Sequence, residues 1–280
     1  MAPAYSLPAE MEQSVAMTPA LLPQEPTEEA KRRRMGPPRD LIAEARRLDG
    51  VPFMDGRSSE GEIVEVGNGK FFIPRGVADP RLGRVRRMRK YYNQVGLEEL
   101  ARSVGRDTVM VDANAGFGND IIFWAVEAGA KKIYAFEGDA QEGELLEKNI
   151  KLNSLGEKVV WQPCAISDGE KILDIRERRL HSFFHRRKGE NRDVPAKPLD
   201  DFGVFFTDDT IDLLRIGGWD VSEGTIDGAK NTLAKCKFVL VDNEGLERTG
   251  LATKMKEYGF TRVDFSGRGE LYKNSSIQDA

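Results

Sequence analysis

The hydrophobic pattern becomes regular from about residue 107, where two kinds of segment alternate. Short apolar runs, typical of strands covered on both faces, are separated by longer segments with helical spacing of apolar positions. The predicted strands are TVMVDA, KIYAFE, KVVWQPCAI, IDLLRI and KFVLVDN, and the predicted helices are NDIIFWAVEAGA, DAQEGELLEKNIKLNSLG, TIDGAKNTLAKC and LATKMKEYG. Strands alternating with helices predict parallel βαβ units, and therefore an α/β fold with a doubly wound, mostly parallel sheet.

Two further runs close the chain. FTRVDFS and ELYKNS flank the turn Gly267-Arg268-Gly269, a pattern that predicts an antiparallel hairpin. Added to the five core strands, this C-terminal edge hairpin gives a seven-stranded sheet. The segment KILDIR, between the third and fourth core strands, is interpreted as an extra edge strand.

The chain divides into three parts by composition and pattern. Residues 1–38 are rich in Pro, Ala, Glu and Gln and are predicted to be a disordered tail. Residues 39–105 form an extension with a short amphipathic helix at Asp40–Leu48, two short strands around Gly67-Asn68-Gly69, and one or two further helices. Residues 106–280 form the α/β domain.

Composition narrows the class of protein without naming a function. The chain has 280 residues, 40% hydrophobic and 31% charged, with a net charge of −4, which is ordinary for a globular protein. We expect no membrane span, because no run approaches the roughly 18 apolar residues that a span needs. Cys164 and Cys236 lie in apolar segments outside any metal-binding spacing, so we expect buried free thiols, no metal and a cytoplasmic location.

The loop after the first predicted strand carries the clearest chemical signal. It reads Asp112-x-Asn114-x-Gly116-x-Gly118, with Ala115 between, and leads into a helix whose free N-terminal amides face the carboxyl edge of the sheet. The spacing does not match the dinucleotide fingerprint GxGxxG or the P-loop GxxxxGK[ST]. It is close to the acid-x-Gly-x-Gly-x-Gly pattern of S-adenosylmethionine (SAM) methyltransferases. A carboxylate such as Asp112 attracts the cationic end of SAM, and small residues make room for its amino-acid part.

The second predicted strand ends in an acid. Glu137 follows Asp112 by 25 residues, and an acid at this point can accept hydrogen bonds from both hydroxyls of a ribose. NAD enzymes share the feature, so Glu137 alone does not distinguish between the two cofactors.

A longer stretch, from VDANAGFGND to AISDGE and again from LDDFG to NTLAKC, resembles the FkbM-type methyltransferases, a Rossmann-like SAM-dependent family. The resemblance covers roughly residues 95 to 275. It implies that SAM is the cofactor and that the first loop, the end of the second strand and the segment beside the adenine bind it. The positions implied are Asp112, Asn114, Ala115, Gly116, Gly118, Glu137, Gly138, Asp139, Ala165, Ser167 and Asp168. Asn114 and Gly116 depart from the family residues at their positions.

The largest departure follows the fourth predicted strand. The family pattern K-I-D-V-E-G aligns with Arg215 to Asp220, which read RIGGWD, so both family acids are replaced. Asp220 stands one position late and is retained as a candidate catalytic residue. The replacement also suggests an alternative, a non-catalytic SAM-fold protein with a regulatory or scaffold role.

Two histidines offer a general base. His181 and His185, four residues apart in HSFFHRR, would share one face of a helix and are candidate catalytic residues for a hydroxyl acceptor. Basic segments at residues 81–90 and 176–192 are compatible with an anionic acceptor, although charge balance on the surface explains them as well.

These features predict a SAM-dependent methyltransferase that acts on a hydroxyl of a small molecule or sugar. The non-catalytic protein remains the first alternative. A nucleic-acid methyltransferase, suggested by the arginine clusters, is a further one. An NAD-dependent oxidoreductase is disfavoured by the loop spacing, and the sequence leaves the oligomeric state open.

Overall fold

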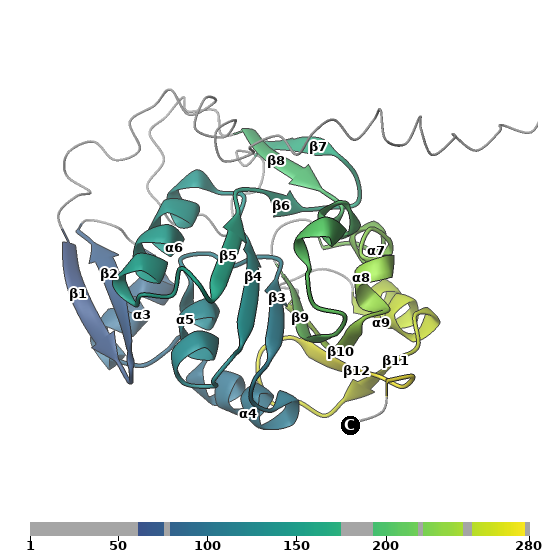
Figure 1. The fold of residues 1–280 in the computed structure, drawn as a ribbon, viewed down its shortest axis with the longest axis horizontal. Helices are drawn as coiled ribbons and strands as arrows, with labels where there is room; N and C mark the ends of the chain where they lie inside the picture. The colour runs from purple at the N-terminus through teal and green to yellow at the C-terminus, as the bar shows by residue number, and fades with distance from the viewer. Residues whose placement is uncertain (1–60, 76–78, 175–192, 218–220, 243–247, 278–280) are drawn as a thin grey trace, which may run out of the picture. The chain divides into compact units, whose positions relative to one another are not determined.

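The computed structural model describes residues 61–75, 79–174, 193–217, 221–242 and 248–277. At its centre lies a seven-stranded sheet of order β11-β12-β10-β9-β3-β4-β5 (Figure 1). In chain order the strands are β3 (Val109–Asp112), β4 (Lys132–Phe136), β5 (Val159–Gln162), β9 (Ile211–Gly217), β10 (Cys236–Asp242), β11 (Phe260–Val263) and β12 (Glu270–Asn274). The predicted doubly wound, mostly parallel α/β sheet is confirmed.

The order of the strands reverses at the centre of the sheet. The chain winds outward from β3 to β5 and then returns to place β9 on the other side of β3. All neighbours from β5 to β10 pair in parallel, whereas β12 pairs antiparallel with both β10 and β11. The C-terminal hairpin of β11 and β12 is therefore confirmed. β12 lies between β10 and β11, and β11 is the edge strand of the sheet. The point between β3 and β9 is where an open α/β sheet binds its ligands.

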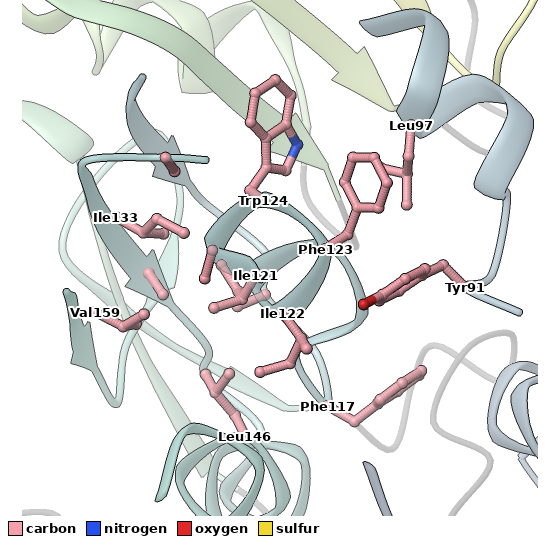
Figure 2. Close-up of a cluster of buried hydrophobic side chains, with 14 of the residues drawn as sticks. Tyr91, Leu97, Phe117, Ile121, Ile122, Phe123, Trp124, Ile133, Leu146 and Val159 are labelled. Atoms are coloured by element: carbon pink, nitrogen blue, oxygen red, sulfur yellow. The ribbon is translucent and has the colours of Figure 1, made fainter. Parts of the chain in front are cut away.

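The sheet is covered on both faces because successive residues of each strand point to opposite sides. Met110, Ile133 and Leu213 face a layer that contains α4 (Gln94–Val104), α5 (Asn119–Val126) and α6 (Ala140–Leu152). Figure 2 shows the centre of this layer, with Ile121, Ile122 and Trp124 of α5 between the sheet and Tyr91 and Leu97. The opposite face packs on η2 (Leu199–Phe205), α7 (Glu223–Asp227), α8 (Lys230–Leu233) and α9 (Arg248–Glu257).

The predicted N-terminal hairpin is also present, as β1 (Gly61–Val66) and β2 (Gly69–Pro74), and α3 (Pro80–Met88) follows it. Two asparagines, one in α6 and one at its C-cap, bind the backbone of β2: Asn149 Oδ1 accepts from Phe72 N at 2.8 Å, and Asn153 Oδ1 accepts from Lys70 N at 2.8 Å. Phe71 packs edge-on against Phe117, with ring centroids 6.1 Å apart. The described part of the extension therefore shares one core with the α5–α6 layer.

Three predictions about individual elements are wrong. KILDIR is no edge strand of the main sheet, since its strand β7 (Lys171–Asp174) pairs with β8 (Asp193–Lys197) in a three-stranded sheet with β6 (Ala165–Ile166). KVVWQPCAI divides into β5 and β6, because Pro163 has no N–H to donate to a ladder. TIDGAKNTLAKC divides into α7 and α8 around Gly228, which caps the first of them.

Several other predictions fall outside the described residues, among them the tail, the helix at Asp40–Leu48 and the segment 176–192. Within the described part of the chain, both cysteines are buried and unpaired, as expected. No described helix combines the length and apolar character that crossing a bilayer requires.

Candidate functional site

The loop of residues 112–118, called the glycine loop below, joins β3 to α5 at the carboxyl edge of the sheet. Gly116 has φ +54° and Gly118 has φ +91°, left-handed conformations that favour glycine. Ala115 N donates to Phe136 O at 3.0 Å, which anchors the loop to the end of β4. The residues predicted from the spacing are therefore brought together at one point of the sheet edge.

Asp112 ends β3 and is completely buried. Its Oδ1 accepts from Asn114 N at 3.0 Å and from Arg215 Nη1 at 2.9 Å. Its Oδ2 is buried and has no hydrogen-bond partner among the described residues. Burial raises the pKa of this carboxyl group, against the opposing effect of Arg215. A buried acceptor without a donor is costly, so Oδ2 is suited to receive a donor from a ligand.

Glu137 follows β4 and ties two loops together. Its Oε2 accepts from Gly116 N at 2.7 Å, and its Oε1 accepts from Asp139 N at 2.7 Å. Each carboxylate oxygen can accept a second hydrogen bond, so Glu137 retains capacity for two further donors. Burial, followed by the nearby charges of Glu142 and Asp139, holds the pKa of Glu137 well above its usual range.

The segment after Glu137 leads to the predicted adenine side. Asp139 caps α6 by accepting from Gln141 N and Glu142 N. Gly138 lies so close to the start of β6 that a Cβ on it would stand 2.9 Å from Ala165 N. A side chain is therefore excluded at position 138, and the structure brings Gly138 and Ala165 together as the resemblance implies.

Ser167 and Asp168 lie beyond Ala165 and make structural contacts. The buried Ser167 donates through Oγ to Gly169 O at 2.6 Å, and Asp168 pairs with Lys171 at 2.6 Å. Their role toward a cofactor stays a prediction.

Sequence reasoning missed a buried arginine at the centre of the edge. The guanidinium of Arg215, on β9, lies 2.9 Å from Asp112 Oδ1, 3.2 Å from Asp120 Oδ2 and 2.9 Å from Asp242 Oδ2. It also donates to Asn114 O at 2.8 Å. Arg215 therefore links the ends of β3, β9 and β10 to the start of α5. A charged residue inside the apolar run IDLLRI was the one signal of it in the sequence.

A carboxylate does stand beside the positions where the family acids are replaced. Asp242 ends β10 and pairs in register with Gly217, and a Cβ on Gly217 would lie 3.4 Å from the Asp242 Cβ. Asp242 also accepts from Arg268 Nε at 2.8 Å. Although burial opposes it, the two arginines lower the pKa of Asp242, so this carboxyl group is ionised and serves as an anchor for them.

The predicted catalytic residues are not among those that the structure describes. His181, His185 and Asp220 fall outside the described residues, so their roles stay predictions. Among the residues that are described, no three His, Cys, Asp or Glu side chains are arranged to hold a metal ion.

Comparison with known proteins gives the site a context. A family model described as the TRM5/TYW2 methyltransferase domain matches residues 86–175, which contain the glycine loop, Glu137 and Ala165–Asp168. Ribosomal protein L11 methyltransferase of Bacillus pumilus (strain SAFR-032) is 28% identical over 155 residues, 54% of this chain and 44% of the relative. The aligned region thus spans less than half of that relative.

Two solved structures are similar to the chain at low identity. Methanocaldococcus jannaschii Trm5 in complex with adenosine has a TM-score of 0.45 and 17% identity, over 80% of this chain and 57% of that chain. The methyltransferase FkbM from Methylobacillus flagellatus KT has a TM-score of 0.44 and 12% identity, over 60% of this chain and 44% of that chain.

Residues 86–175 thus resemble a SAM-dependent methyltransferase domain. The match is to the TRM5/TYW2 model and does not single out the FkbM type that the sequence suggested. The hydrogen-bond acceptors at this edge of the sheet fit SAM. The unpartnered Asp112 Oδ2 suits its ammonium group, Glu137 has acceptor capacity for two ribose hydroxyls, and Gly116 and Gly118 adopt the left-handed backbone that the loop between them requires.

The buried acids of the site predict a pH-dependent stability. Burial, with Asp139 adding and Arg81 opposing, raises the pKa of Glu142 to about 7 from an ordinary 4.5. Because the pKa of Glu142 is higher in the folded protein than in the unfolded chain, protonation of Glu142 stabilises the fold. This contribution is fully present below pH 4.5 and is lost as the pH rises through about 7. We expect the melting temperature of the ligand-free protein to fall across this range and Glu142→Gln to flatten the fall. A wild-type melting temperature independent of pH between these limits would contradict the expectation.

Proposed function

We propose that this protein is a SAM-dependent RNA methyltransferase that binds its substrate on the basic face of α3. The observation that carries the proposal is the position of that helix. The described side chains of Arg84, Arg86, Arg87, Arg89 and Lys90 are all exposed, on α3 and the two residues after it.

The basic face begins beside the cofactor. Arg81, in the first turn of α3, pairs with Glu142 of α6, and its guanidinium lies 5.4 Å from the centre of the Phe117 ring in the glycine loop. Since a helix rises about 1.5 Å per residue, the exposed arginines follow within roughly 15 Å of this contact. A polyanion bound there would reach the carboxyl edge of the sheet, although the whole chain carries a net charge of −4.

The family match supports RNA over the small-molecule hydroxyl that the sequence suggested first. The matching model is named after Trm5, and a Trm5 has been solved in complex with tRNALeu. Guanidinium groups bind phosphates with two parallel hydrogen bonds, which suits an arginine-rich helix to a nucleic-acid backbone.

The chain's own residues divide the work of methyl transfer. SAM supplies a methyl group on a positively charged sulfur. Asp112 and Glu137 would hold the two ends of the cofactor, and Arg215 fixes the orientation of Asp112. Transfer is an in-line displacement, so alignment of donor and acceptor by these rigid strand ends is the main contribution that the fold makes.

The test is incorporation of labelled methyl groups from SAM into separated RNA, protein and small-molecule fractions. We expect label in RNA that ribonuclease removes. Label confined to protein, the acceptor class named for the Bacillus relative, or to small molecules would overturn the RNA assignment. SAM binding without label in any fraction would favour the non-catalytic alternative.

Charge removal on α3 tests the binding surface. The double variant Arg84→Gln/Arg87→Gln is expected to weaken RNA binding and to reduce the slope of log affinity against log salt by about 1.4, since each lost phosphate contact on a single strand contributes about 0.7. SAM affinity is expected to stay unchanged. The matched control, Lys235→Gln/Lys256→Gln, removes two exposed charges on the α8–α9 side of the sheet and is expected to leave the slope as it is. Equal slopes in both double variants would rule out α3 as the RNA surface.

A further inference from the structure

Arg81 connects the N-terminal extension to the glycine loop through buried charges. Its Nη2 lies 2.7 Å from Asp79 Oδ2 and 2.8 Å from Glu142 Oε1. Asp79 is itself buried, and it caps α3 by accepting from Arg81 N and Leu82 N. The guanidinium therefore contacts two buried carboxylates, and its side chain is only 25% exposed, whereas the later arginines of α3 are exposed.

The pair formed by Arg81 and Glu142 makes the wall behind Gly116. A Cβ on Gly116 would stand 2.7 Å from Glu142 Oε2 and 3.5 Å from Arg81 Nη1. On its other side, Gly116 donates its N–H to Glu137. The position of Gly116, and with it the hydrogen bond to Glu137, thus depends on where the Arg81–Glu142 pair lies.

The same pair decides how much negative charge gathers around Glu137. Within the described residues, two pairs of ionisable groups surround it. One pair is Glu142 of α6 with Asp139, the N-cap of that helix, and the other is Arg81 of α3 with its N-cap Asp79. Arg81 contacts two of these buried carboxyl groups, Asp79 and Glu142. Without it, Glu142 and Glu137 would stand as neighbouring carboxyl groups in a low-dielectric environment, which favours a proton on one of them.

We propose that Arg81 is a positioning residue for the cofactor, which by pairing with Glu142 offsets negative charge beside Glu137 and holds Glu137 oriented toward the ribose hydroxyls of an adenosyl ligand. The inference rests on the proposed function only for the identity of that ligand. Arg81 lies outside residues 86–175, the range that the family model matches, so the contribution comes from the chain's own extension.

The experiment measures the affinity for S-adenosylhomocysteine by calorimetry between pH 5.5 and 8.5. Arg81→Gln is expected to bind about tenfold more weakly at pH 7, and the pH at which affinity is half lost on acidification is expected to rise by about one unit. Arg81→Lys, which keeps the charge, should recover the wild-type pH profile and most of the affinity. The matched control Arg102→Gln, which removes an exposed arginine in the last turn of α4, should bind the ligand as the wild type does.

A double variant separates positioning from stability. If Arg81 acts by neutralising Glu142, the variant Arg81→Gln/Glu142→Gln should bind no more weakly than Glu142→Gln alone, so the two losses are not additive. Additive losses, or a pH profile of Arg81→Gln identical to that of the wild type, would overturn the inference. Should Arg81→Gln fail to fold, two comparisons remain. Arg81→Lys should keep the wild-type pH profile, and Arg81→Gln/Glu142→Gln should bind the ligand as tightly as Glu142→Gln alone.

The outcomes also separate this inference from the proposed function. A wild-type protein that binds no S-adenosylhomocysteine would refute the cofactor and both proposals with it. A wild-type protein that binds the ligand and methylates RNA, together with an Arg81→Gln variant that does the same across the pH range, would refute the role of Arg81 alone.

Discussion

Replacing Arg215 by Gln is expected to lower the free energy of unfolding by about 3–5 kcal/mol, because removing one partner of a buried ion pair leaves its counter-charges uncompensated. Three carboxyl groups, those of Asp112, Asp120 and Asp242, converge on this guanidinium. Their combined attraction outweighs burial and raises the pKa of Arg215, so the arginine is charged at every pH at which the protein is folded. The glutamine side chain can replace one hydrogen bond and no charge.

Urea unfolding at pH 7 measures the loss. The matched control is Arg262→Gln, whose side chain is 65% exposed and lies 3.4 Å from Glu270; a change within about 0.5 kcal/mol is expected there. The pKa of Asp242 is lowered in the folded state, so the stabilisation that it gains from Arg215 is present above its unfolded value of 3.8 and is lost as the pH falls below it. The gap between the wild type and Arg215→Gln should therefore narrow below pH 4. An Arg215→Gln loss of less than 1 kcal/mol at pH 7 would show that water compensates the acids.

The fold could be predicted because its signals are local. Each core strand from TVMVDA to KFVLVDN is a short apolar run followed by a helical pattern, and the glycine loop shows in its spacing alone. Asp139 was predictable as a cap, since a short acceptor side chain before a helical run has one common use, and it does accept from Gln141 N and Glu142 N. Glu137 was predictable from its place at the end of the second strand.

The charges that organise the site could not be predicted in the same way. In the sequence, Arg81 is one of several basic residues in a charged helix, and Arg215 is a lone charge in an apolar strand. Their partners, Glu142 and Asp242, lie 61 and 27 positions further along the chain. Only the sheet order, which places β9 between β3 and β10, brings Asp112 and Asp242 to the same guanidinium. Hydrophobic periodicity carries no information about such pairings.

The replaced acid motif after β9 is a second case in which the sequence of one strand did not reveal the charges at the site. Reading RIGGWD against K-I-D-V-E-G suggested that carboxylates were missing from this part of the edge. Asp242 stands beside Gly217 because parallel strands in register bring their ends together. A motif comparison along one strand could not detect a carboxylate contributed by the next strand.

A methyl group added at Gly116 is expected to weaken cofactor binding roughly 100-fold. Gly116 has φ +54°, where a Cβ costs about 1–2 kcal/mol, and the added Cβ would also stand 2.7 Å from Glu142 Oε2. Relieving that contact moves Glu142 away from Arg81 or moves the loop away from Glu137. Either movement disturbs the hydrogen bond of 2.7 Å that Gly116 N donates to Glu137.

Gly105→Ala separates the backbone effect from the steric one. Gly105 also has a positive φ, +99°, but a Cβ there would meet nothing within 4 Å. Both variants should therefore lose some stability through backbone strain, whereas only Gly116→Ala should lose affinity for S-adenosylhomocysteine. If the two variants bound the ligand equally well, the space behind the glycine loop would have no part in holding the cofactor. A loss of affinity restricted to Gly116→Ala would instead support a role for the position of the Gly116 amide. Glu137, Glu142 and Arg81 would then act on the ligand through that amide.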